Sequence, residues 1–313
     1  MKCLVTGGAG FIGSNLVDKL INEGNEVVVI DNESSEAHDQ FYWNKNAINY
    51  KYDICDYDNC KTIFETHKPE VVFHLAAEAR IQPCINNPIK AVHTNVLGTA
   101  NILELSRKFN TKRVIYSSTS SSYGLKNNSP LNENMIPDCL NAYSVSKVSG
   151  EELCKMYSKL YGLETVIFRY FNVYGERQPL KGQYAPVIGI FLRQFKNNEP
   201  MTIIGDGSQK RDFTHVSDVV DANIKASKFI APKYIIDDEI KNTIYEWGQI
   251  YNVGTGKNYS ILEISNMIGN NIKYLPPRPG EVYITLAQIS KIKNHFGWKP
   301  TINLEDWIKS QLF

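Results

Sequence analysis

A glycine-rich segment near the N-terminus constrains the fold more than any other feature of this chain. It spans Thr6 to Gly13, with glycine at positions 7, 10 and 13, between an apolar run (2–5) and an amphipathic stretch (12–23). These glycines allow a tight turn, a close approach of the backbone to phosphate, and close packing of a helix on a strand. The N-terminus of the helix that follows presents free N–H groups to negative charge. Because the required strand and helix flank the segment, it predicts a dinucleotide-binding turn.

Short apolar runs alternate with amphipathic stretches through the first half of the chain. The expected strands include residues 4–5, 27–30, 71–73, 113–116 and 165–168, and the expected helices cover 12–23, 60–67, 95–109 and 143–161. Continuously apolar strands that alternate with helices indicate a parallel sheet covered on both faces. The predicted fold class is therefore α/β, a doubly wound parallel sheet of the Rossmann type.

The alternation weakens after Tyr170, where prolines become frequent and the expected loops lengthen. Residues 215–228 again have a helical pattern, and 251–253 again have the pattern of a strand. We predict a nucleotide-binding domain at 1–170, to which 213–253 return. A smaller C-terminal α/β domain, at 171–212 and 254–313, is predicted to bind the substrate.

Composition and charge argue against several classes of protein. Of the 313 residues, 42% are hydrophobic and 21% are charged, and the formal net charge is +1. A charge this close to neutral argues against a protein that binds nucleic acid or a membrane surface through a basic face. No apolar run approaches the roughly 20 residues of a membrane span. The first expected strand begins at the second residue, which leaves no room for a targeting peptide, and the six cysteines form no CxxC pair. We expect a cytoplasmic protein with no metal site.

Asp31, at the end of the second expected strand, predicts the cofactor. A carboxylate there can accept hydrogen bonds from the ribose hydroxyls of adenosine and repels a 2′-phosphate, so NAD is favoured over NADP. A solvated acid at a strand end is the alternative interpretation. Asp53 and Ile54, between the expected strands at 27–30 and 71–73, are candidate adenine contacts.

Tyr143 and Lys147 lie four residues apart on a predicted helix and share one face. Free tyrosine has a pKa of about 10, which a nearby ammonium and a positive nicotinamide ring would both lower. Such a pair is also common on helix surfaces. The hydroxyl-rich tract 117–124 favours the functional interpretation, because it directly follows an apolar strand and such strands end at the ligand crevice.

Further motifs extend in order through nearly the whole chain. They are His74-Leu75-Ala76-Ala77, Tyr123-Gly124, Arg169-Tyr170-Phe171-Asn172-Val173-Tyr174-Gly175, Gly205-Asp206-Gly207 with Arg211-Asp212-Phe213, Asn252-Val253-Gly254, and Arg278-Pro279-Gly280-Glu281. With them the chain resembles the extended short-chain dehydrogenase/reductase family, in its nucleotide-sugar epimerase/dehydratase branch.

The resemblance implies a role for each matching residue. Tyr143 is the catalytic base, Lys147 orients the nicotinamide ribose, and Thr119 hydrogen-bonds the reacting oxygen. The residues implied to contact NAD are Gly7, Gly10, Phe11, Ile12, Gly13, Asp31, Asn32, Asp53, Ile54, Leu75, Ala76, Ala77, Asn95, Ser117, Tyr143, Lys147 and Tyr170. Those implied to contact the substrate are Glu78, Ser120, Ser121, Asn172, Arg211, Arg278 and Thr285. The two arginines suit a diphosphate, because a guanidinium meets phosphate oxygens with two parallel hydrogen bonds.

The resemblance further implies an NAD-dependent enzyme that epimerises carbon 4 of a UDP-sugar. Tyr143 would take the proton of the 4-hydroxyl while hydride leaves carbon 4. The 4-keto sugar would then turn over and receive the hydride on its other face. The sugar stays attached because its binding energy resides in the nucleotide, remote from the reacting carbon.

Two alternatives remain open from the sequence. A 4,6-dehydratase of this family carries an acid pair directly after the Ser/Thr, where this chain has Ser120 and Ser121, which favours epimerisation. Glu78 resembles the dehydratase pattern and keeps that reaction open. An alternative of another class is a non-catalytic NAD-binding protein, which the intact Tyr143 and Lys147 disfavour.

Thr285 is a candidate determinant of the size of the sugar that the site accepts, and two predicted helices are candidates for a homodimer interface. Epimerases limited to non-acetylated sugars resemble one another in carrying tyrosine at the matching position, so a smaller residue leaves volume for an N-acetyl group. We therefore expect UDP-GlcNAc and UDP-GalNAc to be accepted, alone or beside UDP-glucose and UDP-galactose. The resemblance also implies a homodimer joined through residues 95–109 and 143–161, although burial within one subunit would explain their apolar faces equally well.

Overall fold

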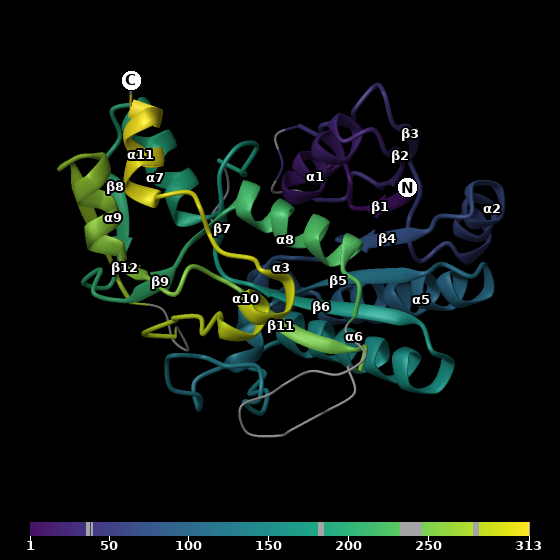
Figure 1. Ribbon diagram of the computed structural model, residues 1–313. Coiled ribbons are helices and arrows are strands. Elements are labelled where there is room, and N and C mark those ends of the chain that lie inside the picture. Colours follow the sequence, from purple (N-terminus) through teal and green to yellow (C-terminus); the bar gives the residue numbers. More distant parts are fainter. Residues whose placement is uncertain (36–37, 39, 181–184, 232–245, 278–281, 313) are drawn as a thin grey trace.

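A seven-stranded parallel sheet forms the centre of the computed structural model, which describes all residues except 36–37, 39, 181–184, 232–245, 278–281 and 313 (Figure 1). The strands lie in the order β11-β6-β5-β4-β1-β2-β3. Their bounds are β1 Lys2–Thr6, β2 Glu26–Ile30, β3 Ile48–Tyr50, β4 Val71–His74, β5 Arg113–Thr119, β6 Glu164–Tyr170 and β11 Gln249–Val253. This order confirms the predicted doubly wound parallel sheet.

Both faces of the sheet are buried, as the continuously apolar strands predict. Along β1, Cys3 and Val5 face one cluster of buried residues, whereas Leu4 faces another. Because successive side chains of a strand point to opposite faces, both sides of β1 must be covered. Helices α1 (Phe11–Asn22) and α8 (Val216–Lys228) pack on one side, and α2 (Tyr57–His67), α5 (Gly98–Lys108) and α6 (Ala142–Tyr161) cover the other.

The connections reverse direction between β1 and β4, which are neighbours in the sheet but not in the sequence. The chain winds outward from β1 through β2 to β3, and then from β4 through β5 to β6. The loops that follow β1 and β4 therefore part at their carboxyl ends and leave a crevice between them. This is the position at which such sheets bind ligands.

The helix predicted at 95–109 begins earlier and is irregular. Two short helices, α3 (Ile81–Asn86) and α4 (Pro88–Val92), precede a π-helical turn, η1 (His93–Leu97), which continues into α5. Asn87 starts α4 by accepting a hydrogen bond from the Lys90 N–H, with Pro88 in the first turn. The apolar periodicity did not reveal this start, because Ile89 and Val92 are exposed.

The C-terminal part builds a smaller layer beside the carboxyl ends of the large sheet. It holds three two-stranded sheets, which pair β7 (Val173–Tyr174) with β10 (Thr214–His215), β8 (Met201–Ile204) with β13 (Ile272–Leu275), and β9 (Lys210–Asp212) with β12 (Asn258–Ser260). Helices α7 (Val187–Lys196), α9 (Ile261–Ile268) and α11 (Leu304–Leu312) enclose a separate apolar cluster, whereas α8, β11 and α10 (Ser290–Phe296) lie on the large sheet. The domain boundaries stay a prediction. In the described part of the chain, every helix is too short or too polar to cross a membrane.

Candidate active site

A cavity of about 1090 Å³ runs from the glycine-rich turn to the smaller C-terminal layer. Gly7, Gly10 and Asp31 line one end, and Thr202 and Arg211 line the other. The volume lies slightly above the usual range of ligand pockets in proteins, which ends at about 1,000 Å³. Its position at the carboxyl ends of β1, β4, β5 and β6 is the crevice described above.

The glycine-rich turn at one end of the cavity has no room for side chains. A Cβ at Gly13 would lie 2.1 Å from the Gly7 carbonyl oxygen, and a Cβ at Gly7, whose φ is +70°, would lie 2.7 Å from the Ala76 nitrogen. Helix α1 therefore starts against the backbone of the turn. This leaves a backbone cradle and the first N–H groups of α1 open to the cavity, which fits the pyrophosphate of a dinucleotide.

Asp31 is held at the edge of this cradle by the backbone. One carboxylate oxygen accepts a hydrogen bond from the Ala9 N–H at 3.0 Å, and the other accepts one from the Glu33 N–H at 2.8 Å. Burial raises the pKa of Asp31, and these two hydrogen bonds oppose the rise. The carboxylate is thus oriented before any ribose arrives.

Asp53 lies behind this edge and does not line the cavity described here. Its carboxylate accepts a hydrogen bond from Asn32 Nδ2 at 2.9 Å and another from the Cys55 N–H at 2.8 Å. Asn32 and Ile54 do line the cavity, as does Tyr52, which the sequence analysis did not single out.

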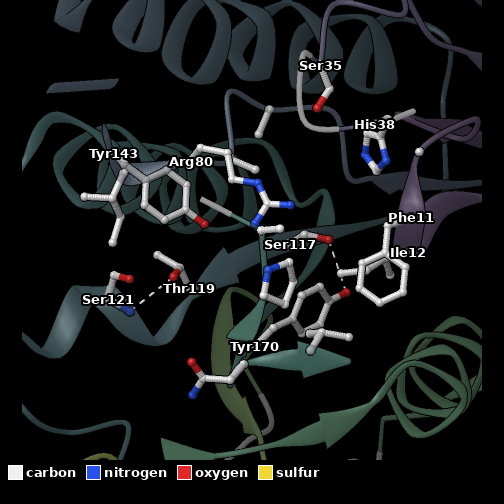
Figure 2. A pocket seen from close by; sticks show the side chains of 18 of the residues that line it. Phe11, Ile12, Ser35, His38, Arg80, Ser117, Thr119, Ser121, Tyr143 and Tyr170 are labelled. Atoms are coloured by element: carbon white, nitrogen blue, oxygen red, sulfur yellow. Dashed lines mark hydrogen bonds between the residues drawn. The ribbon is translucent and has the colours of Figure 1, made fainter. Parts of the chain in front are cut away.

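Tyr143 stands at the middle of the cavity, on the first turn of α6 (Figure 2). Asn141 begins that helix with a reciprocal pair of hydrogen bonds to Ser144, which fixes where the first turn starts. Burial raises the pKa of Tyr143, whereas a hydrogen bond with Thr119 and the charge of Arg80 lower it. Tyr143, Thr119 and Lys147 all line the same cavity, as the sequence predicted.

Lys147 lies deeper than Tyr143, one turn further along α6. Its side chain is 3% exposed, and its ammonium lies 4.3 Å from the centre of the Tyr116 ring. Burial lowers its pKa to about 8, and the charge of Glu151 opposes that fall. Arg80 is a second cation at this end of the cavity, and its charge lowers the pKa of Tyr143.

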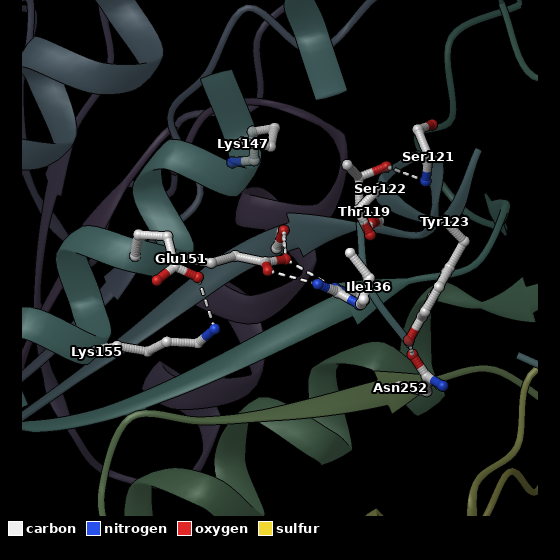
Figure 3. Close-up of polar contacts among 12 residues, drawn as sticks. Thr119, Ser121, Ser122, Tyr123, Ile136, Lys147, Glu151, Lys155 and Asn252 are labelled. Carbon is white, nitrogen blue, oxygen red and sulfur yellow. Dashed lines mark hydrogen bonds and ion pairs between the residues drawn. The ribbon is translucent and has the colours of Figure 1, made fainter. Parts of the chain in front are cut away.

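A buried ion pair lies below Lys147 (Figure 3). Glu151 accepts two hydrogen bonds from Arg169, at 2.8 and 2.7 Å, and a third from the Ser118 hydroxyl at 2.5 Å. Both charged side chains are almost completely buried. The Arg169 guanidinium also lies 4.7 Å from the centre of the Tyr123 ring. The pair ties α6 to β5 and β6 directly beneath the cavity.

Tyr170 closes the wall opposite Tyr143. Its hydroxyl accepts a hydrogen bond from Ser117 at 3.1 Å and another from Asn223 Nδ2 at 2.8 Å. Burial raises the pKa of Tyr170 to about 12, so this phenol stays neutral near pH 7. Tyr170 and Ser117 both line the cavity, as expected of cofactor contacts.

The predicted substrate residues divide into three groups, because Glu78 and Thr285 are described but do not line the cavity. Ser120, Ser121, Asn172 and Arg211 line the cavity, whereas Arg278 lies outside the described residues. The remaining residues named from the sequence on the cofactor side, Phe11, Ile12, Leu75, Ala76 and Ala77, also line it.

Besides Asp53, three further predicted contacts, Asn95, Glu78 and Thr285, are not among the lining residues. Asn95 is 1% exposed and makes two hydrogen bonds with the Glu78 backbone. Its Oδ1 accepts from the Glu78 N–H at 2.8 Å, and its Nδ2 donates to the Glu78 carbonyl at 3.1 Å. The Glu78 carboxylate pairs with Lys90 at 2.7 Å. Thr285 is 9% exposed and accepts a hydrogen bond from the Asp212 N–H at 3.4 Å. All three are placed to support neighbouring loops.

Two arginines that line the cavity were missed by the sequence analysis, Arg80 and Arg193. Arg80 follows the His74–Ala77 motif by three residues, so its place after a strand end was a usable signal. Arg193 lies within α7, where nothing in the periodicity distinguishes it from a solvated helix residue. Its buried Nε has no hydrogen-bond partner among the described residues.

The chain is similar to known proteins over nearly its whole length. The family model described as GDP-mannose 4,6 dehydratase matches residues 4–311. A putative UDP-glucose 4-epimerase of Methanocaldococcus jannaschii is 41% identical, over 98% of this chain and 95% of that protein.

Two solved structures share the whole fold. The UDP-glucose 4-epimerase of Thermotoga maritima, solved with UDP-glucose, superposes with a TM-score of 0.89 at 35% identity, covering 100% of this chain and 97% of that one. The UDP-glucose 4-epimerase of Thermus thermophilus, solved with NAD, superposes with a TM-score of 0.86 at 30% identity, covering 100% and 98%.

Proposed function

The chain belongs to the NAD-dependent nucleotide-sugar epimerase/dehydratase family of extended short-chain dehydrogenases/reductases, and we propose that it inverts carbon 4 of a UDP-sugar. The observation that carries the proposal is the place of Tyr143. Its phenol stands in the cavity between the glycine cradle, which suits a dinucleotide, and the C-terminal layer, which carries Asn172 and Arg211.

Each catalytic residue acts through an atom at the middle of the cavity. Tyr143 accepts the proton of the sugar 4-hydroxyl, and Thr119 hydrogen-bonds the same oxygen and keeps it in line. Lys147, where it is protonated, provides a positive charge beneath them, and it would hydrogen-bond the nicotinamide ribose when NAD is bound. NAD⁺, when bound, accepts hydride from carbon 4 and returns it to the other face of the sugar, so the reaction leaves no net redox change.

Epimerisation is favoured over dehydration by the residues around the sugar end. A dehydratase must also move a proton on and off carbon 5, which needs an acid and a base. Ser120 and Ser121 line the cavity where the family's dehydratases carry that pair, and neither can ionise usefully near neutral pH. The Glu78 carboxylate, which had kept dehydration open, pairs with Lys90 instead.

The substrate is proposed to be UDP-GlcNAc and UDP-GalNAc, UDP-glucose and UDP-galactose, or both pairs. Asn172, Arg211 and Arg278 would hold the diphosphate. Acceptance of the acetylated sugars rests on the small residue at Thr285, which acts from behind Asp212 and not from the cavity wall.

The test is NMR of the product formed from each UDP-sugar by the NAD-loaded protein. The proposal expects the sugar with inverted carbon 4, and a 4-keto-6-deoxy product would overturn it. Tyr143→Phe should lose turnover by several orders of magnitude and still bind NAD. Tyr161→Phe, on the exposed end of α6, is the matched control and should retain turnover. If the chain were a non-catalytic NAD-binding protein, neither variant nor the parent chain would turn over any UDP-sugar.

We also propose a homodimer formed through residues 95–109 and 143–161, extended by the helix α4 that precedes them. Exposed apolar side chains lie along α6 and its neighbours: Met156, Leu160, Leu97, Val92 and Ile89. Such a stripe of apolar side chains is typical of a protein interface. Replacement of Met156 and Leu160 together by Glu should halve the molar mass measured by light scattering. An unchanged mass would place the dimer interface elsewhere or exclude it.

A further inference from the structure

Arg80 is a charged residue at the reacting end of the cavity to which the proposed mechanism gives no role. It precedes α3, lines the cavity and carries its guanidinium beside the Tyr143 hydroxyl (Figure 2). We propose that Arg80 is a positioning residue for proton transfer, which holds Tyr143 in its phenolate form from the open side of the cavity. The inference rests on the proposed function, because it concerns the base of that reaction.

The backbone that carries Arg80 is fixed to the helix that carries Tyr143. Asn95 hydrogen-bonds both the N–H and the carbonyl of Glu78, and its Nδ2 also donates to the Ser146 hydroxyl at 2.9 Å. Ser146 in turn donates to the Tyr143 carbonyl at 2.9 Å. An unbroken set of hydrogen bonds thus connects the loop to the first turn of α6. Arg80 and Tyr143 are therefore held in register before a ligand binds.

The groups around Tyr143 come from three elements. Arg80 and Cys84 approach from the start of α3, Thr119 ends β5, Tyr116 lies deeper in β5, and Lys147 follows on α6 itself. Burial raises the pKa of Tyr143, and Arg80 supplies the positive charge that lowers it. The Lys147 ammonium lies over the Tyr116 ring, deeper in the protein than Tyr143.

The two cations differ in the pH range over which they act. Lys147, with a pKa of about 8, loses its charge just above neutral pH. Burial also lowers the pKa of Arg80, but a guanidinium starts so high that it stays charged at every working pH. Arg80 therefore favours the phenolate throughout that range, and Lys147 only where it is protonated. An opposite charge within a few ångströms is sufficient to move a pKa by about one unit or more.

The experiment compares Arg80→Met and Arg80→Lys with the parent chain, all loaded with NAD. In Arg80→Met, the acid limb of kcat/KM should move up by about one pH unit, which lowers kcat/KM on the acid side about tenfold. Arg80→Lys should recover most of that loss, because it returns the charge. Arg107→Met, which removes an exposed arginine paired with Glu104 on α5, is the control and should leave the limb in place.

A second measurement follows Tyr143 without turnover. Tyrosine labelled with ¹³C at Cζ reports ionisation of the phenol, and the Tyr143 signal is assigned by its loss in Tyr143→Phe. The Arg80→Met signal should titrate at higher pH than that of the parent chain. If that titration and the acid limb both stay in place, Arg80 acts only on ligand binding or folding and the inference is overturned.

The two proposals fail in different ways. A titration that moves in a protein that epimerises no UDP-sugar would defeat the proposed function and leave Arg80 as the partner of Tyr143. Arg80→Gln, which keeps a polar side chain without the charge, replaces Arg80→Met if the latter does not fold. It should give the same shift.

Discussion

The two ends of the cavity are built from different parts of the chain and by different means. At the glycine-rich end the contacts are between backbones, and Gly13 lies so close to Gly7 that no Cβ would fit. At the C-terminal end a single side chain, Asp212, collects hydrogen bonds from the N–H groups of Thr255, Gly256 and Ala287. The cofactor end is thus shaped by neighbouring loops of one sheet, whereas the substrate end depends on one carboxylate that joins segments distant in the sequence.

Gly13→Ala is the strongest test of this difference. The added Cβ would lie 2.1 Å from the Gly7 oxygen, and backbone cannot move aside as a flexible side chain can, so the turn must open. We expect the affinity for NAD to fall about a hundredfold or more, with the affinity for UDP nearly unchanged, as measured by calorimetry. At Gly24 an added Cβ meets nothing within 4 Å, although φ is +77°, so Gly24→Ala should cost only about 1 kcal/mol of stability. Equal losses of NAD and UDP affinity in Gly13→Ala would mean that the two ends are not independent.

Asp212→Asn tests the other end. Burial raises the pKa of Asp212, and the four donors on its two oxygens oppose the rise. An amide can accept at only one of those oxygens, so two donors lose their partner, at about 1 kcal/mol each. The free energy of unfolding should fall by about 2 kcal/mol in chemical denaturation. Binding of UDP should weaken about tenfold, whereas binding of NAD should not change; a matching loss of NAD affinity would contradict the comparison.

The difference between the cofactor end and the substrate end also explains which parts of the fold could be predicted from the sequence. The large sheet follows from local patterns: the glycine turn, continuous apolar strands and helices with one apolar face all occur within about 15 residues of one another. The pairs β8–β13 and β9–β12 join segments some 50 to 70 residues apart through strands of three or four residues. Strands that short carry too few alternations to be recognised, and nothing local specifies their partners.

The site divides in a similar way. Tyr143 and Lys147 were singled out by their spacing on one helix and Thr119 by the family resemblance, and all three line the cavity. Arg80 was missed because its contact with Tyr143 arises only when the loop after β4 meets α6. Asp53 and Asn95, predicted to contact NAD, do not line the cavity and hydrogen-bond neighbouring loops, since a motif identifies a residue without telling which atoms it touches.

Glu151→Gln tests a support beneath the cofactor end. The carboxylate raises the pKa of Lys147 against the effect of burial, so its loss should lower that pKa further below about 8. In the proposed mechanism protonated Lys147 is the active form, so activity that falls above pH 8 in the parent chain should begin to fall about one unit lower. The measurement is the alkaline limb of kcat against pH, with the affinity for UDP as a control that should not move.

Removal of Glu151 alone leaves Arg169 buried without its partner, which can cost several kcal/mol. Glu151→Gln combined with Arg169→Met removes both charges, and it replaces the single variant if the latter does not fold. An alkaline limb that stays in place in a folded variant would show that Lys147 does not set it.

Substitutions of Thr285 are expected to have the smallest effect on activity. They test whether the substrate end of the cavity selects between acetylated and plain sugars. Thr285 lies behind Asp212, so Thr285→Ser should change the ratio of kcat/KM for UDP-GlcNAc over UDP-glucose by less than about twofold. Tyrosine is too large for that buried position and must push the adjoining loop toward the cavity. We expect Thr285→Tyr to lower the ratio about fivefold, the low end of what one pocket contact contributes. Equal losses for the two sugars would assign the effect to the packing around Asp212, and the acetyl group would then be selected by other residues.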